Sequence, residues 1–152
     1  MRKTFANLLF KKMEINKKIF LICGDLGWGV LENVQSKFPD RFLNTGASEE
    51  ASIGMCVGMT YNNIIPIFYS ITNFALFRPF EIIRNFVDYE KTPVKIIGCG
   101  RSREYGKDGP SHWSDDANYV LNGWKNIQQF WPETKEDIPN LMNEFLYNKK
   151  PC

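Results

Sequence analysis

Hydrophobic and polar residues follow two periodicities that alternate along the chain. Residues 19–23 form a continuous apolar run, typical of a strand buried in a parallel sheet, and residues 64–71 and 94–98 are two further predominantly apolar runs. Between these runs, apolar residues recur three and four positions apart, which is typical of amphipathic helices. The pattern predicts strands at residues 19–23, 41–44, 64–71, 94–98 and 126–130, and helices at residues 2–16, 30–37, 49–59, 79–90, 114–121 and 135–147.

This alternation of strands and helices predicts the fold class. It implies a mostly parallel sheet covered on both faces, which is an α/β three-layer sandwich. Such sheets bind ligands at the loops that follow the carboxyl ends of their strands. Asp25 and residues 46–49, 72–77 and 101–112 each follow a predicted strand. We therefore expect these four segments to gather along one edge of the sheet.

Length and composition indicate one globular domain, residues 1–152. Of its 152 residues, 43% are hydrophobic and 14% aromatic, which is enough for a real core and unlike a disordered protein. The sequence has no internal repeat and no domain linker. Its last four residues, Lys149-Lys-Pro-Cys152, look like the start of one more strand. We therefore expect a domain truncated before its last strand, or one piece of a split protein.

Charge and cysteine content argue against several classes of protein. The net charge of +2 is too small, and Lys and Arg are too dispersed, to indicate nucleic-acid binding. No apolar run reaches membrane-spanning length and no signal peptide is visible, so we expect no membrane association. Four widely spaced cysteines and a single histidine do not form a metal-ligand pattern, so no metal site is expected. We expect buried free thiols in a reducing cytosol, and hence a cytoplasmic protein.

Residues 44–59 combine a turn with the start of a small apolar helix. Gly46 marks the turn, Ser48 can cap the helix, and Glu49 and Glu50 fall in its first turn, where the helix dipole favours negative charge. The residues that follow are small and apolar, so we expect the helix to be buried or packed against another chain. Two interpretations of the acid pair stay open. The carboxylates are solvated and complement the dipole, or one of them is held at an apolar interface for chemistry.

A resemblance favours the second interpretation. Five features follow one another in order between residues 17 and 122: Asp25, the segment Phe38-Pro-Asp-Arg-Phe-Leu-Asn-Thr-Gly46 leading to Glu49, Pro66, the aromatic triplet Phe74, Phe77 and Phe80, and Asp108-Gly-Pro-Ser-His112. In this order they resemble the pyrimidine-binding (middle) domain of transketolase-like thiamin diphosphate enzymes, which include the deoxyxylulose-phosphate synthases. The resemblance implies the thiamin-diphosphate-binding fold of that domain.

The resemblance also implies roles around the cofactor. Glu49 falls on the family's catalytic acid, which hydrogen-bonds N1′ of the aminopyrimidine ring and so helps the thiazolium C2 to lose its proton. Phe74, Phe77 and Phe80 resemble the aromatic wall around this ring, where a low dielectric strengthens the hydrogen bond. The alternative for these three aromatic residues is ordinary core packing.

Two further residues are expected at the site. His112 lies in a Gly- and Pro-bearing loop, and an imidazole suits proton transfer on the substrate; the alternative is a surface histidine. Asp25 matches an Asp that follows the family's first strand, although Asp before a turn is also common. Phe80 replaces the usual Tyr, and Trp113 stands where many relatives have Gln, so the family's sugar preference does not carry over.

The half of the family's site that binds diphosphate has no counterpart in the sequence. The family uses Gly-Asp-Gly and a later Asn to bind Mg²⁺, and Gly24-Asp-Leu-Gly27 is not that motif. We therefore expect half of a transketolase-like enzyme that moves two-carbon ketol units between sugars or sugar phosphates. A separate diphosphate-binding chain would complete the thiamin diphosphate and Mg²⁺ site in an oligomer. Alternatives are a deoxyxylulose-phosphate synthase-like or 2-oxoacid decarboxylase-like component, or a non-catalytic partner-binding domain.

Overall fold

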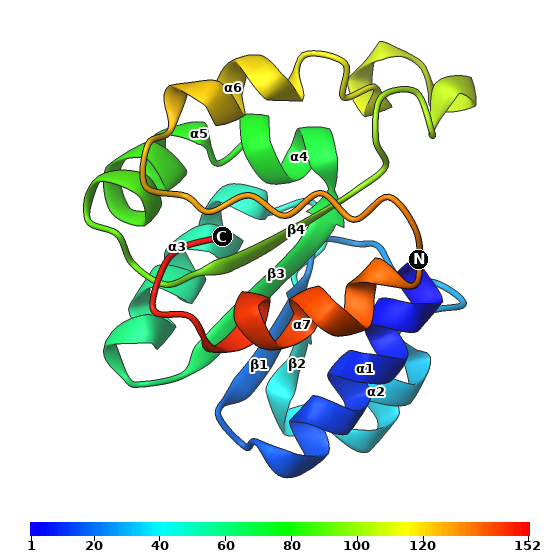
Figure 1. The fold of residues 1–152 in the computed structure, drawn as a ribbon, viewed down its shortest axis with the longest axis vertical. Coiled ribbons are helices and arrows are strands. Elements are labelled where there is room, and N and C mark those ends of the chain that lie inside the picture. The colour runs from blue at the N-terminus through cyan, green and yellow to red at the C-terminus, as the bar shows by residue number, and fades with distance from the viewer.

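A four-stranded parallel sheet forms the centre of the molecule, and helices cover both of its faces (Figure 1). The computed structural model describes residues 1–152. The strands are β1 (Ile19–Cys23), β2 (Phe42–Asn44), β3 (Ile65–Ile71) and β4 (Lys95–Cys99), in the spatial order β2-β1-β3-β4. All three strand pairs are parallel, with Leu21 opposite Phe42 and Ile67, and Ile67 opposite Lys95. The predicted three-layer α/β sandwich is confirmed.

Each face of the sheet has its own hydrophobic core. The first core lies under three helices, α1 (Arg2–Ile15), α2 (Glu32–Lys37) and α7 (Asp137–Tyr147). The second core lies under α3 (Glu49–Tyr61), α4 (Thr72–Phe77), α5 (Phe80–Ile82), the π-helical segment η2 (Ile83–Tyr89) and α6 (Ala117–Gly123). Strand β1 shows why both cores form, because Leu21 and Cys23 face the first core and Ile22 faces the second. A strand buried on both faces needs the continuous apolar run that the sequence has.

The chain between β3 and β4 departs from the predicted single helix. That helix was expected over residues 79–90, but the structure has α4 directly after β3, a turn at Arg78 and Pro79, then α5 and η2. Pro79 does precede a helix, as predicted, because a proline needs no N–H partner there. The hydrophobic pattern did not distinguish an α-helix from a π-helix, since Ile83 and Val87 face the core in either form. Three short 3₁₀ turns, η1 (Pro39–Arg41), η3 (Gly106–Asp108) and η4 (Pro110–His112), complete the elements.

The predicted strand at residues 126–130 is wrong. The segment is extended, but it forms no ladder, and its backbone bond is from the Gln128 N–H to the Pro151 carbonyl (2.9 Å). The end of the chain lies against β4, where the Cys152 N–H donates to the carbonyl of Val94 (3.1 Å). Lys95 holds it there, because its buried ammonium donates to the carbonyls of Asn148 (3.0 Å) and Lys150 (2.7 Å). Burial lowers the pKa of Lys95, and these carbonyl partners offset part of the cost of burying its charge.

The four cysteines are free and buried, as predicted. Burial raises the pKa of Cys23 to about 11 and those of Cys56 and Cys99 to about 12. These thiols are therefore protonated near neutral pH and behave as small apolar core residues. No helix is long and apolar enough to cross a membrane.

Candidate functional site

The loops after the four strands lie along one edge of the sheet, as predicted from their order in the sequence. The strands are parallel, so their carboxyl ends share this edge (Figure 1). Hydrogen bonds join the loops in pairs. The Asp25 N–H donates to Asn44 Oδ1 (3.2 Å), the Thr72 hydroxyl donates to the Gly100 carbonyl (2.7 Å), and the Asn73 amide donates to the carbonyl of Ser111 (3.2 Å).

Glu49 is a buried carboxylate at this edge. It is the first residue of α3 and only 2% exposed, whereas its neighbour Glu50 faces solvent. Solvated dipole complementation therefore describes Glu50 and not Glu49. Two hydrogen bonds fix the start of α3. The hydroxyls of Thr45 and Ser52 lie 2.7 Å apart, and the Ser52 hydroxyl donates to the carbonyl of Ser48 (2.7 Å). Burial of a carboxylate is costly unless a charged or hydrogen-bonding partner meets it.

Arg78 supplies this partner. Its Nη1 donates to Glu49 Oε1 at 2.7 Å, and its guanidinium carbon lies 3.8 Å from the centre of the Phe74 ring. The two contacts use both properties of a guanidinium, its N–H donors and its flat cationic face. About 45% of the Arg78 side chain is exposed, so the cation faces solvent on one side and Glu49 on the other.

His112 lies on another side of the same aromatic ring. Its imidazole meets Phe74 edge-on, with ring centres 4.9 Å apart and an interplanar angle of 69°. Its Nδ1 is 2.9 Å from the Ser111 hydroxyl, which leaves Nε2 without a partner in the protein. The structure thus brings three of the predicted residues together, since Arg78 contacts both Glu49 and Phe74, and His112 meets the Phe74 ring edge-on.

The other predicted residues are at the edge but not in this cluster. Phe77 and Phe80 are 38% and 39% exposed, and Phe80 stacks on Trp124 with ring centres 5.8 Å apart. They are therefore not plain core residues, which was the alternative to a binding wall. Asp25 is exposed, has a left-handed backbone (φ 48°) and interacts through its N–H with Asn44. Its side chain makes no hydrogen bond within the chain, and its conformation is that of a turn residue.

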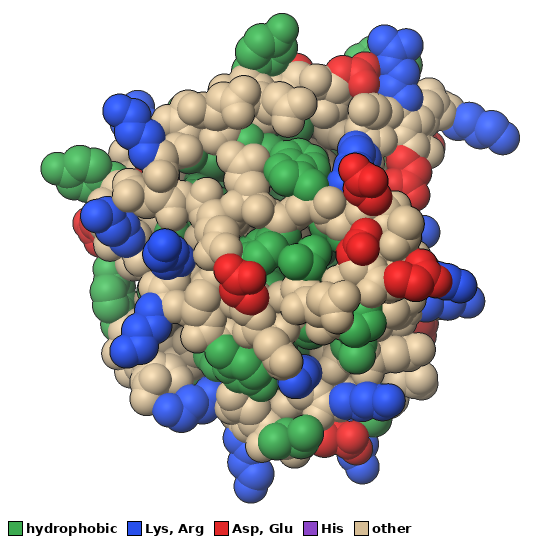
Figure 2. Space-filling view, in the orientation of Figure 1, with side chains coloured by type: hydrophobic (Ala, Val, Ile, Leu, Met, Phe, Trp, Pro, Cys, Tyr) green, Lys and Arg blue, Asp and Glu red, His purple; other side chains and the backbone are tan.

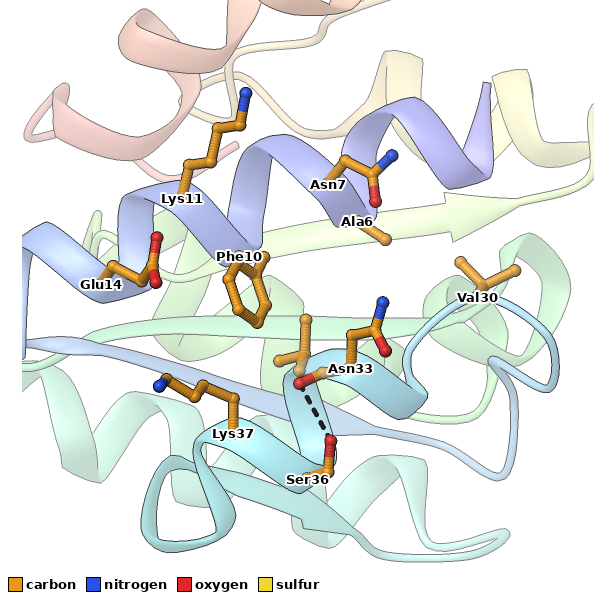
Figure 3. Close-up of a pocket in the computed structure, with 10 residues that line it drawn as sticks. Ala6, Asn7, Phe10, Lys11, Glu14, Val30, Asn33, Ser36 and Lys37 are labelled. Carbon is orange, nitrogen blue, oxygen red and sulfur yellow. Dashed lines mark hydrogen bonds between the residues drawn. The ribbon is translucent and has the colours of Figure 1, made fainter.

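A separate depression lies between α1 and α2 (Figure 3). Phe10, Val34, Lys11, Glu14 and Lys37 are among the residues that line it. The hydrogen bond drawn there, from the Ser36 hydroxyl to the Asn33 carbonyl (3.3 Å), belongs to one turn of α2. The depression contains none of the predicted site residues. In the whole chain, no group of three or more His, Cys, Asp or Glu side chains is placed to hold a metal ion.

Comparison with known proteins identifies this arrangement of elements. Residues 1–152 match the profile of the transketolase pyrimidine-binding domain over their whole length. The chain belongs to the transketolase pyrimidine-binding domain family. A putative transketolase C-terminal section from Methanocaldococcus jannaschii is 34% identical over 152 residues, which are 99% of this chain and 48% of that protein. One subunit of the apulose-4-phosphate transketolase of Actinobacillus succinogenes is 28% identical over 70% of this chain and 34% of its own length.

Solved structures of transketolases share the fold of this pyrimidine-binding domain. A split-gene transketolase, solved as an inactive beta4 tetramer, superposes with a TM-score of 0.84 at 27% identity over 99% of this chain and 48% of that one. The transketolase of Leishmania mexicana superposes with a TM-score of 0.87 at 19% identity, over 99% of this chain and 24% of that one. The chain therefore spans about half the length of its split relatives and a quarter of an undivided transketolase.

Arg78 is the site residue that was not predicted from the sequence. A usable signal was present, because Arg78 is four positions after Phe74 and is the only charged residue between Thr72 and Phe80. A cation inside an aromatic stripe, just before a proline, indicates an unusual environment. What the sequence did not contain was its partner, since Glu49 lies 29 positions earlier and only the fold brings the two together.

We predict that Arg78 and Glu49 stabilise the fold as a coupled pair. Arg78→Met leaves a buried carboxylate without its partner, and Glu49→Gln removes the charge, so the double variant should recover part of the loss. We expect a coupling free energy of about 1–2 kcal/mol, less than for a fully buried pair because water reaches Arg78. Urea denaturation of the wild type, the two single variants and the double variant measures this coupling free energy.

Arg84→Met is the control, because Arg84 is exposed and its side chain bonds only Asn85. Strictly additive effects of the Arg78 and Glu49 changes would contradict the prediction.

Proposed function

We propose that this chain is the pyrimidine-binding half of a thiamin diphosphate enzyme that transfers two-carbon ketol units between sugars. The observation that carries the proposal is the buried Glu49 carboxylate beside Phe74, at the loop edge of a transketolase-type sheet. Burial of a carboxylate costs free energy, so an acid that is only 2% exposed is a candidate for a functional role. At this place it can bind a polar heteroaromatic ring.

The residues present fit such a ring. The Arg78 guanidinium is itself a flat group that donates an N–H to Glu49 and lies against the face of Phe74. The position of Arg78 therefore indicates which groups fit there: a flat group with an N–H donor, placed between a carboxylate and an aromatic ring. A protonated or imino aminopyrimidine ring has the same two properties. Because Arg78 and the ring would compete for Glu49, ring binding requires the half-exposed Arg78 side chain to move outwards.

When bound, the cofactor supplies a nucleophilic carbon that adds to a carbonyl group of the sugar. The work of this chain is to hold the ring and control protons near it. Glu49 shares a proton with the ring nitrogen in a low-dielectric site, where such a hydrogen bond is stronger than in water. Phe74, with Phe77 and Phe80 nearby in sequence, supplies aromatic surface for the ring.

His112 is proposed to act on the substrate side. The Ser111 hydroxyl at 2.9 Å from Nδ1 orients the imidazole, and Nε2 is free to exchange a proton with a substrate hydroxyl or oxyanion. The edge contact with Phe74 keeps the imidazole next to the space assigned to the ring. Asp25, on the neighbouring loop, stays a candidate for contact with the cofactor or the partner chain.

A separate chain is proposed to supply the diphosphate and Mg²⁺ half of the site. This chain has no Gly-Asp-Gly…Asn motif, and no cluster that holds a metal. The large aromatic side chains of Phe77, Phe80 and Trp28 are 38–88% exposed. A partner that covers them would bury the apolar surface and complete an oligomeric enzyme.

A deoxyxylulose-phosphate synthase-type condensation is the second candidate. Several proteins named 1-deoxy-D-xylulose-5-phosphate synthase, for example that of Clostridium acetobutylicum, are 25–29% identical over nearly the whole chain. Both reactions need the same acid and the same ring-binding surface, so these residues do not separate them. The donor substrate distinguishes the two reactions. Ketol transfer consumes a ketose, whereas the condensation consumes a 2-oxoacid and releases carbon dioxide.

We predict that Glu49→Gln, assayed with a diphosphate-binding transketolase subunit and thiamin diphosphate, slows exchange of the C2 proton of the cofactor by orders of magnitude. A neutral amide cannot share a proton with the ring nitrogen as a carboxyl group does. Glu50→Gln is the matched control, because Glu50 belongs to the same helix turn and faces solvent. Proton NMR in deuterated buffer measures both rates, and equal effects from the two changes would show that Glu49 is not the acid.

We predict a different pattern for His112→Ala. Turnover should fall ~100-fold or more, as when a general acid–base group is removed, while affinity for thiamin diphosphate stays almost unchanged. Phe77→Ala should weaken cofactor binding first. Affinity and turnover are measured for both variants on one preparation, together with their melting temperatures. Full turnover by His112→Ala would contradict the substrate-side role, and a joint fall of melting temperature and turnover would assign His112 to packing of its loop.

A further inference from the structure

A second aromatic residue, Tyr105, lies against the imidazole of His112. The two ring centres are 6.3 Å apart and the interplanar angle is 61°, which is the geometry of an edge-to-face aromatic pair. Both side chains are half-buried, and no histidine surface is visible on the face of the molecule drawn in Figure 2. Because Phe74 also meets this imidazole edge-on, the ring of His112 has two aromatic neighbours, one from α4 and one from its own loop.

The loop after β4 folds back on itself and so brings Tyr105 to His112. Tyr105 directly precedes the 3₁₀ turn η3, and His112 ends the next turn, η4. The Asp108 N–H donates to the Tyr105 carbonyl (3.0 Å), and the His112 N–H donates to the Gly109 carbonyl (3.0 Å). The pair of side chains is therefore placed by the backbone of two successive turns.

The ring of Tyr105 is itself fixed by the backbone at Gly100. Gly100 has a φ of 86°, and a β-carbon there would lie 2.5 Å from two carbons of the Tyr105 ring, so only glycine allows this contact. The Gly100 carbonyl accepts hydrogen bonds from the hydroxyls of Thr72 (2.7 Å) and Ser114 (3.1 Å). The Tyr105 hydroxyl accepts a bond from Arg2 Nη1 (3.4 Å). These contacts leave the Tyr105 ring in one position beside the imidazole.

We propose that Tyr105 is a positioning residue for His112, whose ring, together with Phe74, holds the imidazole in one orientation for proton transfer with the substrate. The inference rests on the proposed function, because that function assigns the proton transfer to His112. The χ2 torsion of a histidine is otherwise broad, and rotation about it moves both ring nitrogens. Two packed rings hinder this rotation, and the efficiency of proton transfer depends on the geometry that they preserve.

Hydrogen bonds on the other side of the loop agree with a fixed imidazole. The Ser111 hydroxyl lies 2.9 Å from His112 Nδ1, and the Ser111 carbonyl accepts a bond from the Asn73 amide (3.2 Å). Burial raises the pKa of Tyr105, so its phenol is neutral near pH 7 and places no negative charge beside the imidazole. Tyr105 therefore acts through its ring and not through a charge.

Two variants separate the ring of Tyr105 from its hydroxyl. Tyr105→Leu removes the aromatic ring, whereas Tyr105→Phe keeps it. His112 is the only histidine, so its imidazole signals in the NMR spectrum of the full chain are identified without further assignment. Above the titration range of imidazole, the nitrogen chemical shifts report which ring nitrogen carries the proton. We expect a single tautomer in the wild type and in Tyr105→Phe, and shifts averaged between the two tautomers in Tyr105→Leu.

Turnover of the same variants is measured together with a diphosphate-binding transketolase subunit and thiamin diphosphate. Tyr105→Leu should lower kcat about tenfold, as expected for the loss of one aromatic contact, with the affinity for thiamin diphosphate unchanged. Tyr105→Phe should restore the wild-type rate. Tyr119→Leu is the control, because Tyr119 is 85% exposed and should change neither the tautomer nor the rate.

Three outcomes would overturn the proposal. They are a single tautomer in folded Tyr105→Leu, equal damage by Tyr105→Phe and Tyr105→Leu, and a joint fall of melting temperature and cofactor affinity in Tyr105→Leu, which would assign Tyr105 to the fold alone. Averaged tautomers with full turnover would support the contact between Tyr105 and His112, and would contradict the role proposed for His112. Because the NMR measurement needs neither partner nor cofactor, the positioning contact and the enzymatic function can fail separately.

Discussion

The ion pair between Glu49 and Arg78 is the contact on which the proposed site depends. A carboxylate at 2% exposure is tolerated only with a partner, and the partner here is a cation that also lies on an aromatic ring. The pair joins the start of α3 to the turn after α4, two segments that follow different strands. It thereby keeps a charged acceptor inside an apolar surrounding. The fold therefore holds the acid in place without a ligand, and the ring of the proposed cofactor would compete with this cation for Glu49.

The parallel sheet makes this arrangement possible. Four strands that run in one direction deliver their loops to one edge, so residues separated by tens of positions meet there without long connections. Hydrogen bonds such as that from Asn73 to the Ser111 carbonyl then fix one loop against the next. The residues of the proposed site lie in these loops or in the first turns of the helices that follow them, and both helices pack on the second core.

Much of the fold could be predicted from the sequence, because its decisive signals are local. Predominantly apolar runs predicted β1, β3 and β4, and the small-residue segment that begins with two acids predicted α3. Two kinds of feature could not be found in this way. The Glu49–Arg78 pair is a contact over 29 positions, and the pattern of either segment alone gives no indication of the other. The segment at residues 126–130 has the composition of a strand, but a strand exists only with a ladder to a neighbour, and this segment forms none.

The central proposal is that this chain binds the pyrimidine half of thiamin diphosphate and needs a second chain for the diphosphate half. Isothermal titration of thiamin diphosphate and Mg²⁺ into the chain alone, and into its mixture with a diphosphate-binding transketolase subunit of the same genome, tests it most directly. We expect negligible heat for the chain alone and saturable binding, one cofactor per pair of chains, for the mixture. Tight stoichiometric binding to the isolated chain would contradict the division of the site between two chains.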